Sequence, residues 1–541
     1  MKKIYIITVA IVLSCCFINA KDRLYVYKNG RVAFTTDVTN IDSITFKYKT
    51  ISTKPFIQDS AFAKIYGTLG MTGSEQPGGS LDITGMNEAE TSFIRELWEI
   101  NELPTDEAIC AWNDAGVPDL NFDNWKTSNK QLRGFYARLM FDINLCNQFL
   151  NQTGKMIDSK SVKQIAEVKF LRALNYYYLL DMFGNVPLVT TLSFDLPVQT
   201  SRSNLYDWIV NELLSAEPNM YEPRQAPYYR ADKAAAWMLL SRLYLNALVY
   251  TGTEQYINAA TYAKKVLDSS YKLNPGYAQL FMADNAGTVD GSNTNTAPQE
   301  IILPISCDAS KTKNYYNSMF LIASTRSSDM PNFGSVYWSG NRARASLITK
   351  FFPSGIPTNA NLNNLTSAAG DDRAKFYGTN RSLTITDVSK FTDGFSVTKF
   401  TNLRSDGKAA SYSVSGFTDT DVPLFRIAEA YLTYAEAIIM SNGDKNIALT
   451  YINALRSRSN APALTTVDNS VLIDEWSREF YFEGRRRTDL IRFGAFSWGG
   501  YKWDWQGGSA TGQQFGAYNN LFPIPQAEID NNPNLNQNPG Y

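Results

Sequence analysis

Apolar residues recur at helical spacing along much of the chain. The clearest stretch runs from Ala166 to Phe183, where one helix face would carry Phe170, Leu171, Leu174, Tyr177 and Tyr178. This spacing is typical of an amphipathic helix whose apolar face packs on a core. Gly184 and Pro187 follow, and both residue types commonly mark the end of a helix. The pattern therefore predicts a helix over residues 166–183.

Two further stretches have the pattern of paired helices. Residues 231–250 interleave alanines with Trp237, Leu240 and Tyr244, and a second amphipathic stretch follows at 256–267. A similar pair is expected at 423–440 and 445–457. Small and aromatic residues interleaved over about 34 residues resemble a tetratricopeptide unit. We expect a mainly α fold in which such helical hairpins stack into a right-handed layer.

The segment before these helices alternates like a β-hairpin. Leu24 and Val26 precede Lys28-Asn29-Gly30, and Val32 and Phe34 follow it. Asn-Gly between alternating apolar residues is a strong hairpin signal. We expect residues 21–55 to form a small β-hairpin appendage and linker that acts as a spacer ahead of a main domain at 56–541.

Residues 284–416 differ from the helical stretches on either side. They mix Gly, Asn, Ser and Thr with isolated aromatic residues, as in the run DGSNTNT at 290–296. Loops on a rigid scaffold are where binding residues concentrate. We expect this loop-rich insertion to contribute the ligand surface where it meets loops from the first helices.

The first twenty residues have the pattern of a bacterial export signal. Two lysines precede the apolar run Ile4–Leu13, which is too short to cross a bilayer. Leu13-Ser14-Cys15-Cys16 resembles a lipoprotein box, so we expect residues 1–20 to be a lipoprotein-type signal peptide with lipidation at Cys15 or Cys16. Cleavage after Ala20 is the alternative. No later segment is long and apolar enough to span a membrane, so we expect membrane association through the lipid.

Charge and composition exclude several function classes. Lys plus Arg number 51 against 52 for Asp plus Glu, which gives no electrostatic reason to expect nucleic acid as a partner. The chain has no histidine, which excludes Ser-His-Asp and Cys-His catalysis and HExxH metal sites. Catalysis by paired carboxylates remains open. The 31 Tyr, 30 Phe and 10 Trp mostly indicate a well-filled core.

Three segments together resemble the SusD/RagB family of nutrient-binding lipoproteins. They are EVKFLRALNYYYLLDMFGNVP at 167–187, EWSREFYFEGRRRTDLIRFG at 475–494 and FPIPQAEIDNNPNLNQNPGY at 522–541. In this order they extend the resemblance over nearly the whole chain after residue 55. The resemblance implies a SusD-like fold and a non-catalytic glycan-binding protein. It also implies lipid anchoring to the outer membrane, facing outward, and a TonB-dependent SusC-like transporter as the partner.

Four shorter segments resemble the starch-binding member of that family: NELPTDE at 101–107, MYEPRQAP at 220–227, EIILP at 300–304 and RSDGK at 404–408. In that member an arc of aromatic side chains and a few polar groups hold the ligand. Matching motif by motif places the arc on Trp112, Tyr315 and Trp338, and the polar groups on Asn87 and Arg95. The resemblance therefore implies starch or malto-oligosaccharide as the ligand.

The residue types suit such a ligand. The C–H face of a sugar stacks on aromatic rings while its hydroxyls need directed donors and acceptors, and a curved arc suits an α-1,4-glucan. This sequence departs from the starch-binding pattern at Ala115, where that pattern has Asn, and at Asn87, where it has an acidic residue. Another glycan or a peptide is the alternative ligand. The family member's acidic calcium loop is replaced after Asp284, so we expect neither metal nor cofactor.

Glu479 and Glu483 are the carboxylate pair that a glycoside hydrolase would use. Helical spacing would place both on one face, and Glu483 would also lie one turn from Arg487, which suits an ion pair. Glycosidase carboxylates must flank a sugar across a cleft. We therefore interpret these residues as fastening a helix end, and the hydrolase as the less favoured function.

Overall fold

The computed structural model describes residues 23–28, 31–37, 56–74, 77–193, 195–287, 295–356, 365–410, 416–497 and 499–541. It divides the chain into two compact units, residues 1–56 and 57–541. The expected signal peptide, with Cys15 and Cys16, lies outside the described residues. Unit 1 contains strands β1 (Arg23–Lys28) and β2 (Arg31–Asp37), which pair antiparallel with Lys28 opposite Arg31. The Asn29-Gly30 turn is outside the described residues.

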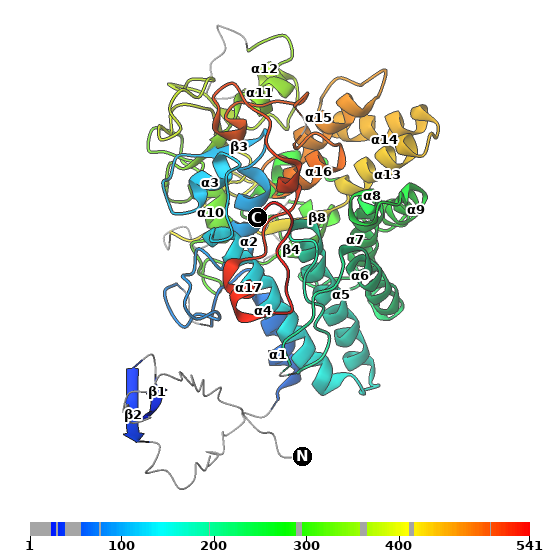
Figure 1. The fold of residues 1–541 in the computed structure, drawn as a ribbon. Coiled ribbons are helices and arrows are strands. Elements are labelled where there is room, and N and C mark those ends of the chain that lie inside the picture. The colour runs from blue at the N-terminus through cyan, green and yellow to red at the C-terminus, as the bar shows by residue number, and fades with distance from the viewer. Residues whose placement is uncertain are drawn as a thin grey trace. The chain divides into compact units, whose positions relative to one another are not determined.

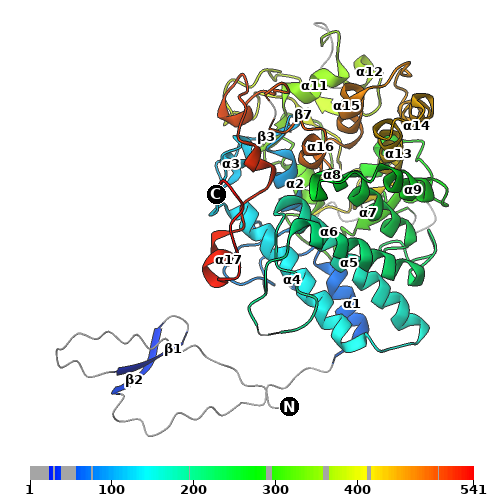
Figure 2. The ribbon, with the colours of Figure 1, turned by 45° about the vertical axis from the view of Figure 1, so that its right-hand side comes forward.

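Unit 2 is mainly α-helical, as expected (Figure 1). Its longer helices are α1 (Gln58–Gly67), α2 (Phe93–Glu102), α4 (Lys130–Thr153), α5 (Ser159–Met182), α6 (Arg202–Ala216), α7 (Lys233–Leu245), α9 (Tyr256–Leu267), α13 (Ala428–Met440), α14 (Lys445–Arg458) and α15 (Asn469–Phe480). Helices α4 to α9 and α13 to α14 pack as successive neighbours along one side, which Figure 2 shows from a second direction. They form the expected stack of helical hairpins.

Side-chain caps explain where several helices begin. The carboxylate of Asp158 accepts a hydrogen bond from the Ser161 backbone N–H, so α5 starts at Ser159, ahead of the predicted residue 166. Asp232 caps α7 in the same way through the N–H groups of Ala234 and Ala235. The single helix predicted for 231–250 is interrupted at Asn246, after which the short helix α8 (Ala247–Thr251) follows.

The predicted helix at 423–440 is wrong over its first residues. Val422–Arg426 form strand β8, which pairs antiparallel with β4 (Ile301–Ile305), and α13 begins only at Ala428. Proline is tolerated near the start of a strand, and Pro423 lies opposite Pro304 where the register shifts. The apolar run was too short for its periodicity to separate a strand from a helix.

The other side of unit 2 is built from short elements. They include β3 (Ala108–Cys110), α3 (Val117–Asn121), α10 (Ser318–Ala323), β5 (Asn341–Ala343), α11 (Ala345–Phe351), α12 (Thr366–Ala369), β6 (Phe376–Tyr377), β7 (Ser396–Val397), α16 (Arg486–Arg492) and α17 (Gln526–Asn531). The pairing of β3 with β5 brings residues 108–112 beside residues 338–343. Two segments separated by more than two hundred residues thereby meet at one edge of the molecule.

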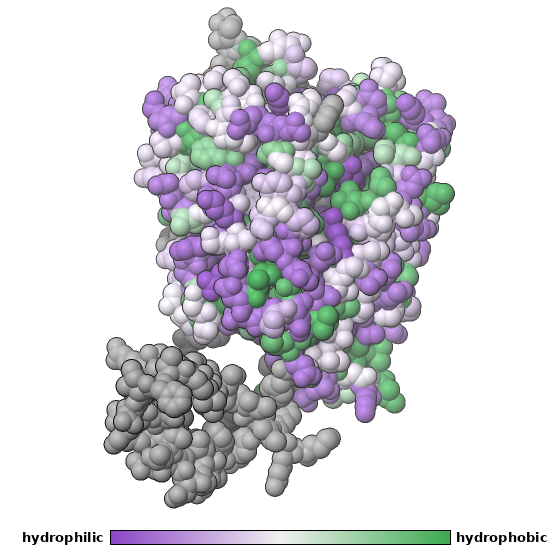
Figure 3. Space-filling model, in the orientation of Figure 1, coloured by the Kyte–Doolittle hydropathy of each residue, from purple (hydrophilic) through white to green (hydrophobic). Residues whose placement is uncertain are grey.

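The described residues include no helix with the length and apolarity needed to cross a membrane. On the face that Figure 3 shows, hydrophobic residues lie in small patches between polar ones. Cys110, Cys146 and Cys307 are buried free thiols. The fold is therefore held by its core and by buried polar contacts.

Candidate functional site

Trp112 and Trp338 lie side by side at the edge that β3 and β5 create. Their ring centroids are 6.4 Å apart with an interplanar angle of 53°, and both side chains are half-buried. The Trp112 indole N–H donates a hydrogen bond to the Trp338 carbonyl oxygen at 3.2 Å. The two rings therefore present differently tilted faces at a fixed separation.

The backbone of residues 338–340 fixes this arrangement. The N–H groups of Trp338, Ser339 and Gly340 donate to the carbonyl oxygens of Ala323, Arg326 and Ser324, at and just beyond the end of α10. Gly340 lies directly against the Trp112 ring, because a Cβ atom there would be 2.3 Å from Trp112 Cε2. Only glycine lets the ring lie in this position.

Arg95 extends from α2 beneath the aromatic side chains and is 6% exposed. Its guanidinium carbon is 5.8 Å from the Trp112 ring centroid and 5.4 Å from those of Tyr316 and Phe320, within the range of cation–π contacts. Its Nε donates to Glu99 Oε1 at 3.0 Å, and its Nη2 is 3.7 Å from the exposed carboxylate of Asp114.

Electrostatics keep Arg95 charged. Burial lowers the pKa of Arg95, but the attraction of Glu99 and Glu96 outweighs burial and raises that pKa above its ordinary value. Burial and then repulsion from Glu99 raise the pKa of Glu96, whose carboxyl is fully buried. Glu99 is the close charge partner of Arg95.

Tyr315 and Tyr316 continue the row of rings beyond Arg95. The Ser92 hydroxyl, at the N-terminus of α2, donates to the Tyr316 carbonyl oxygen at 2.7 Å and ties this loop to the helix. Tyr315 is 40% exposed and its ring lies 5.2 Å from that of Phe417, and 6.2 Å from that of Tyr316. We call Trp338, Trp112, Arg95, Tyr316 and Tyr315 the aromatic row.

Asn87 occupies a different local role. It is exposed, its side-chain oxygen accepts a hydrogen bond from the Glu90 N–H at 2.8 Å, and its carbonyl accepts from the Thr91 hydroxyl. These contacts shape the turn before α2 and do not join Asn87 to the aromatic row. Contacts among described residues thus link four of the five predicted binding residues.

Sequence reasoning missed Tyr316 and Phe320. Tyr316 bridges Arg95 and Tyr315, and Phe320 forms the floor on which Arg95 and Trp112 pack, with ring centroids of Trp112 and Phe320 6.2 Å apart. Adjacent tyrosines at 315 and 316 were the only sequence signal. Which of the two faces Arg95 depends on the Ser92 hydrogen bond, across a separation of 224 residues.

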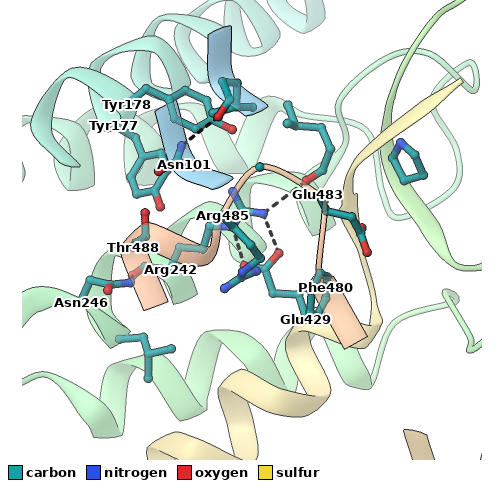
Figure 4. A pocket seen from close by; sticks show the side chains of 15 residues that line it. Asn101, Tyr177, Tyr178, Arg242, Asn246, Glu429, Phe480, Glu483, Arg485 and Thr488 are labelled. Atoms are coloured by element: carbon teal, nitrogen blue, oxygen red, sulfur yellow. Dashed lines mark hydrogen bonds and ion pairs between the residues drawn. The ribbon is translucent and has the colours of Figure 1, made fainter. Parts of the chain in front are cut away.

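A second hollow lies deeper, between α2, α5, α7 and the segment 480–488 (Figure 4). Arg242 and Arg485 both pair with Glu429 there, and Arg485 also pairs with Asp489. The hollow has a volume of about 30 Å³, which is room for about two water molecules. It is too small for a sugar ring, and its charges already pair with one another.

The carboxylates of Glu479 and Glu483 are held in ion pairs. Helix α15 ends at Phe480 and Phe482 has a φ of 63°, so Glu479 and Glu483 do not share one helix face. Glu483 pairs with Lys399 and Arg426, each at 2.7 Å, and the predicted pair with Arg487 is wrong.

Arginines saturate this region. Arg426 lies 2.6 Å from Glu479, which also pairs with Arg458 and Arg373. Burial raises the pKa of Glu479, but these arginines outweigh burial and bring the pKa well below its ordinary value. Arg487 instead donates to the Asn520 carbonyl oxygen at 2.6 Å. The interpretation of a fastened helix end holds, with different partners.

A scaffold of helical hairpins that presents a half-exposed row of aromatic rings over one arginine defines a class: proteins that hold a ligand by stacking and directed hydrogen bonds. Sequence comparison is more specific. Residues 270–541 match the family model described as the SusD family, and residues 81–245 match one described as starch-binding associating with outer membrane. The chain belongs to the SusD family.

Individual relatives agree with this membership. The starch-binding protein SusD of Bacteroides thetaiotaomicron is 45% identical over 520 residues, which cover 90% of this chain and 92% of the relative. A SusD-like carbohydrate-binding protein of Bacteroides fragilis has a TM-score of 0.68 at 20% identity, over 88% of this chain and 98% of that one. Surface glycan-binding protein A of B. thetaiotaomicron, solved with laminarihexaose, has a TM-score of 0.63 at 18% identity, over 89% and 98%. The solved structures share the fold.

Proposed function

We propose that this protein binds starch or malto-oligosaccharides at the aromatic row without cleaving them. The observation that carries the proposal is the pair of tilted tryptophan rings, Trp112 and Trp338, at 53° to one another beside a buried Arg95. Rings inclined to each other follow a curved chain, and a glucan with α-1,4 linkages curves. The named starch-binding relative, 45% identical, supports the same ligand class.

Arg95 supplies the directed polar contact. A guanidinium carries five N–H donors. In this site Nε donates to Glu99, and the ion-pair partner of Nη2 among the described residues is the Asp114 carboxylate at 3.7 Å. A sugar hydroxyl can accept from such a donor without any charge of its own. Stacking on the rings and donation by Arg95 together select shape and hydroxyl position, and they break no bond.

We further propose that the protein is anchored through a lipid at Cys15 or Cys16 and faces outward from the outer membrane. There it would deliver its ligand to a TonB-dependent SusC-like transporter. The match of residues 81–245 to a family described as associating with the outer membrane supports this location. A different glycan is the second candidate ligand, because exposed Ala115 offers no side-chain hydrogen bond where the starch-binding pattern has Asn.

Calorimetric titration of protein lacking residues 1–20, with maltoheptaose or a cyclic α-glucan, tests the proposal. We expect binding by the wild type, loss of the binding at the aromatic row in Trp338→Ala, and recovery of the sugar uncleaved. Trp208→Ala is the matched control, because Trp208 is a half-buried tryptophan on α6 that packs against Tyr176 and Arg172. No heat with either glucan would refute starch binding, and shortened sugar would refute the non-catalytic role.

A further inference from the structure

Trp237 is a half-buried tryptophan on the helical side of unit 2. It lies on α7, where its neighbours Ala234–Ala236 and Met238–Leu240 are all buried. Figures 1 and 2 both place α7 and α9 on the side of unit 2 away from α3, and Figure 1 shows α10 beside α3, near the aromatic row. Trp237 is therefore not part of the site described above, and part of its side chain is open to solvent.

Polar groups hold the Trp237 ring in one orientation. Its indole N–H donates to Glu217 Oε1 at 2.7 Å. Lys265 Nζ lies 5.6 Å from the Trp237 ring centroid and 4.6 Å from that of Tyr262, and 4.0 Å from the Glu217 carboxylate. Tyr262 in turn stacks on Tyr244 with centroids 5.5 Å apart at 25°. The Trp237 ring is thus held in one orientation, with the partly exposed ammonium of Lys265 beside it. Such a ring can stack on a sugar while the ammonium donates to a sugar hydroxyl.

An open groove runs along this ring. It is shallow and widely open to solvent, and its volume is about 470 Å³. Its lining residues are Pro223, Trp237, Lys265, Asp268, Ser269 and Ser270. Two apolar side chains thus face four side chains that carry hydroxyl, ammonium or carboxylate groups.

The lining discriminates between ligand classes. Asp268 pairs with Lys264, and Lys265 lies 4.0 Å from the Glu217 carboxylate, so the groove has no excess of either charge and does not favour a polyanion. Trp237 and Pro223 alone are too small an apolar surface to anchor a protein interface, whose core is apolar. Neutral ligands with one apolar face and many hydroxyls match both the ring and the polar rim.

Residues that directly follow Pro223 in the chain line a separate hollow. Pro223 is followed by Arg224, whose φ is 64° and whose backbone N–H donates to Asp232 Oδ2 at 2.7 Å. The Arg224 guanidinium lies 6.0 Å from the ring centroid of Tyr271, and both line a hollow of about 230 Å³. The segment MYEPRQAP at 220–227 thus contributes residues to both hollows, a role that the aromatic row does not explain.

We infer that the groove at Trp237 is a second glycan-binding site, which takes a neutral oligosaccharide and adds a further point of attachment for long chains. For its ligand class this inference rests on the proposed function. Sites on different sides of one protein raise its retention on a polymer because the second contact becomes intramolecular. A short oligosaccharide cannot contact both sites at once, so its titration measures the affinity of each site separately.

Trp338→Ala, Trp237→Ala and the double variant test the inference, with Trp237→Phe as the conservative variant and Trp208→Ala as control. Titration with maltoheptaose is expected to show two sites in the wild type, of which each single variant keeps one and the double variant keeps none. On immobilised soluble starch, Trp237→Ala is expected to be retained at least threefold less than wild type, with Trp237→Phe in between. Thermal unfolding checks that every variant is folded.

The outcomes separate the two proposals. A folded Trp237→Ala that matches the wild type in stoichiometry and retention overturns the second site, as does loss of all binding in Trp338→Ala. Binding kept in Trp338→Ala and lost in Trp237→Ala overturns the assignment of the aromatic row while the second site stands. If no α-glucan binds, the same variants are compared on a panel of other neutral glycans, and a panel without a Trp237-dependent ligand overturns the second site.

Discussion

The aromatic row and the buried charge cluster differ in how their polar groups are paired. In the charge cluster, defined here by Glu300, Arg373, Lys399, Arg426, Arg458, Glu475, Glu479 and Glu483, every residue has at least one oppositely charged partner within 3.2 Å. In the aromatic row one arginine stands among rings that are partly open to solvent. Available faces and donors indicate a binding site, whereas a high density of saturated charges indicates structure.

Glu479→Gln, in the charge cluster, is expected to have the largest effect on stability. Removing one partner of a buried ion pair costs about 3–5 kcal/mol of the free energy of unfolding, because the remaining charges stay buried without compensation. Here Arg373, Arg426 and Arg458 would lose a shared carboxylate. Denaturant unfolding measures the change, with the exposed Glu254→Gln as control.

Glycan affinity of the folded Glu479→Gln protein should stay within twofold of the wild type. A large loss of affinity with little change in stability would show that the charge cluster takes part in ligand binding, and the comparison would fail.

Acid is expected to reduce the stability that the charge cluster gives to the fold. Burial raises the pKa of Glu475, but Arg373, Arg478 and Arg456 outweigh burial and lower it to about 2. A carboxyl whose pKa is lower in the folded state stabilises the fold above its unfolded pKa, and the stabilisation is lost as pH falls towards the folded value. Between pH 7 and pH 3 this carboxyl alone should remove about 2 kcal/mol.

Unfolding free energies at pH 7, 5 and 3 measure this loss for the wild type and for Glu475→Gln. The variant is less stable at pH 7, and the gap between the two proteins should narrow towards pH 3. A gap that stays constant with pH would contradict the charged state assigned to Glu475.

Gly340→Ala tests the aromatic row without removing a ring. The new methyl group would lie 2.3 Å from Trp112 Cε2, so the ring must move away from its position beside Trp338. We expect at least tenfold weaker glucan binding, about 1.4 kcal/mol. Gly67→Ala is the control, since its Cβ would meet only the flexible end of Met71 at 3.3 Å. Unchanged affinity in a folded Gly340→Ala protein would exclude Trp112 from the site.

Salt should have the smallest effect. A neutral glucan held by rings and one hydrogen-bonding arginine gains little from long-range charge attraction. Its affinity should therefore change less than twofold between 50 and 500 mM NaCl, over which the Debye length falls about threefold. Titrations at both salt concentrations measure this. A steep salt dependence would indicate a charged ligand, such as a peptide, in place of the glucan.

Sequence patterns predicted those helices whose ends depend on nearby residues in the chain. The helix ending before Gly184 and the hairpins around Trp237 followed from periodicity and termination signals. The strand at Val422–Arg426 did not, because its pairing with Ile301–Ile305 is a tertiary contact that overrides an ambiguous apolar run. Partners of Glu483 were missed for a related reason: the left-handed backbone at Phe482 ends the helical geometry from which Arg487 was inferred.

The site was only partly accessible from sequence. Trp112, Trp338, Tyr315 and Arg95 came from family resemblance and lie in one connected set, whereas Asn87 serves a turn. Tyr316 owes its place to a hydrogen bond with Ser92, and no spacing rule predicts a contact between residues so far apart in the chain.

The hydrogen bonds from Trp338, Ser339 and Gly340 to the end of α10 have a consequence for the entropy of ligand capture. The last carbonyl groups of a helix need partners, and here the loop that carries Trp338 supplies them. The loop is thus ordered as part of the helix end before any ligand arrives. A preorganised surface loses little conformational freedom on binding. Encounter with the ligand, rather than rearrangement of this loop, should therefore limit how fast a glucan chain is taken up.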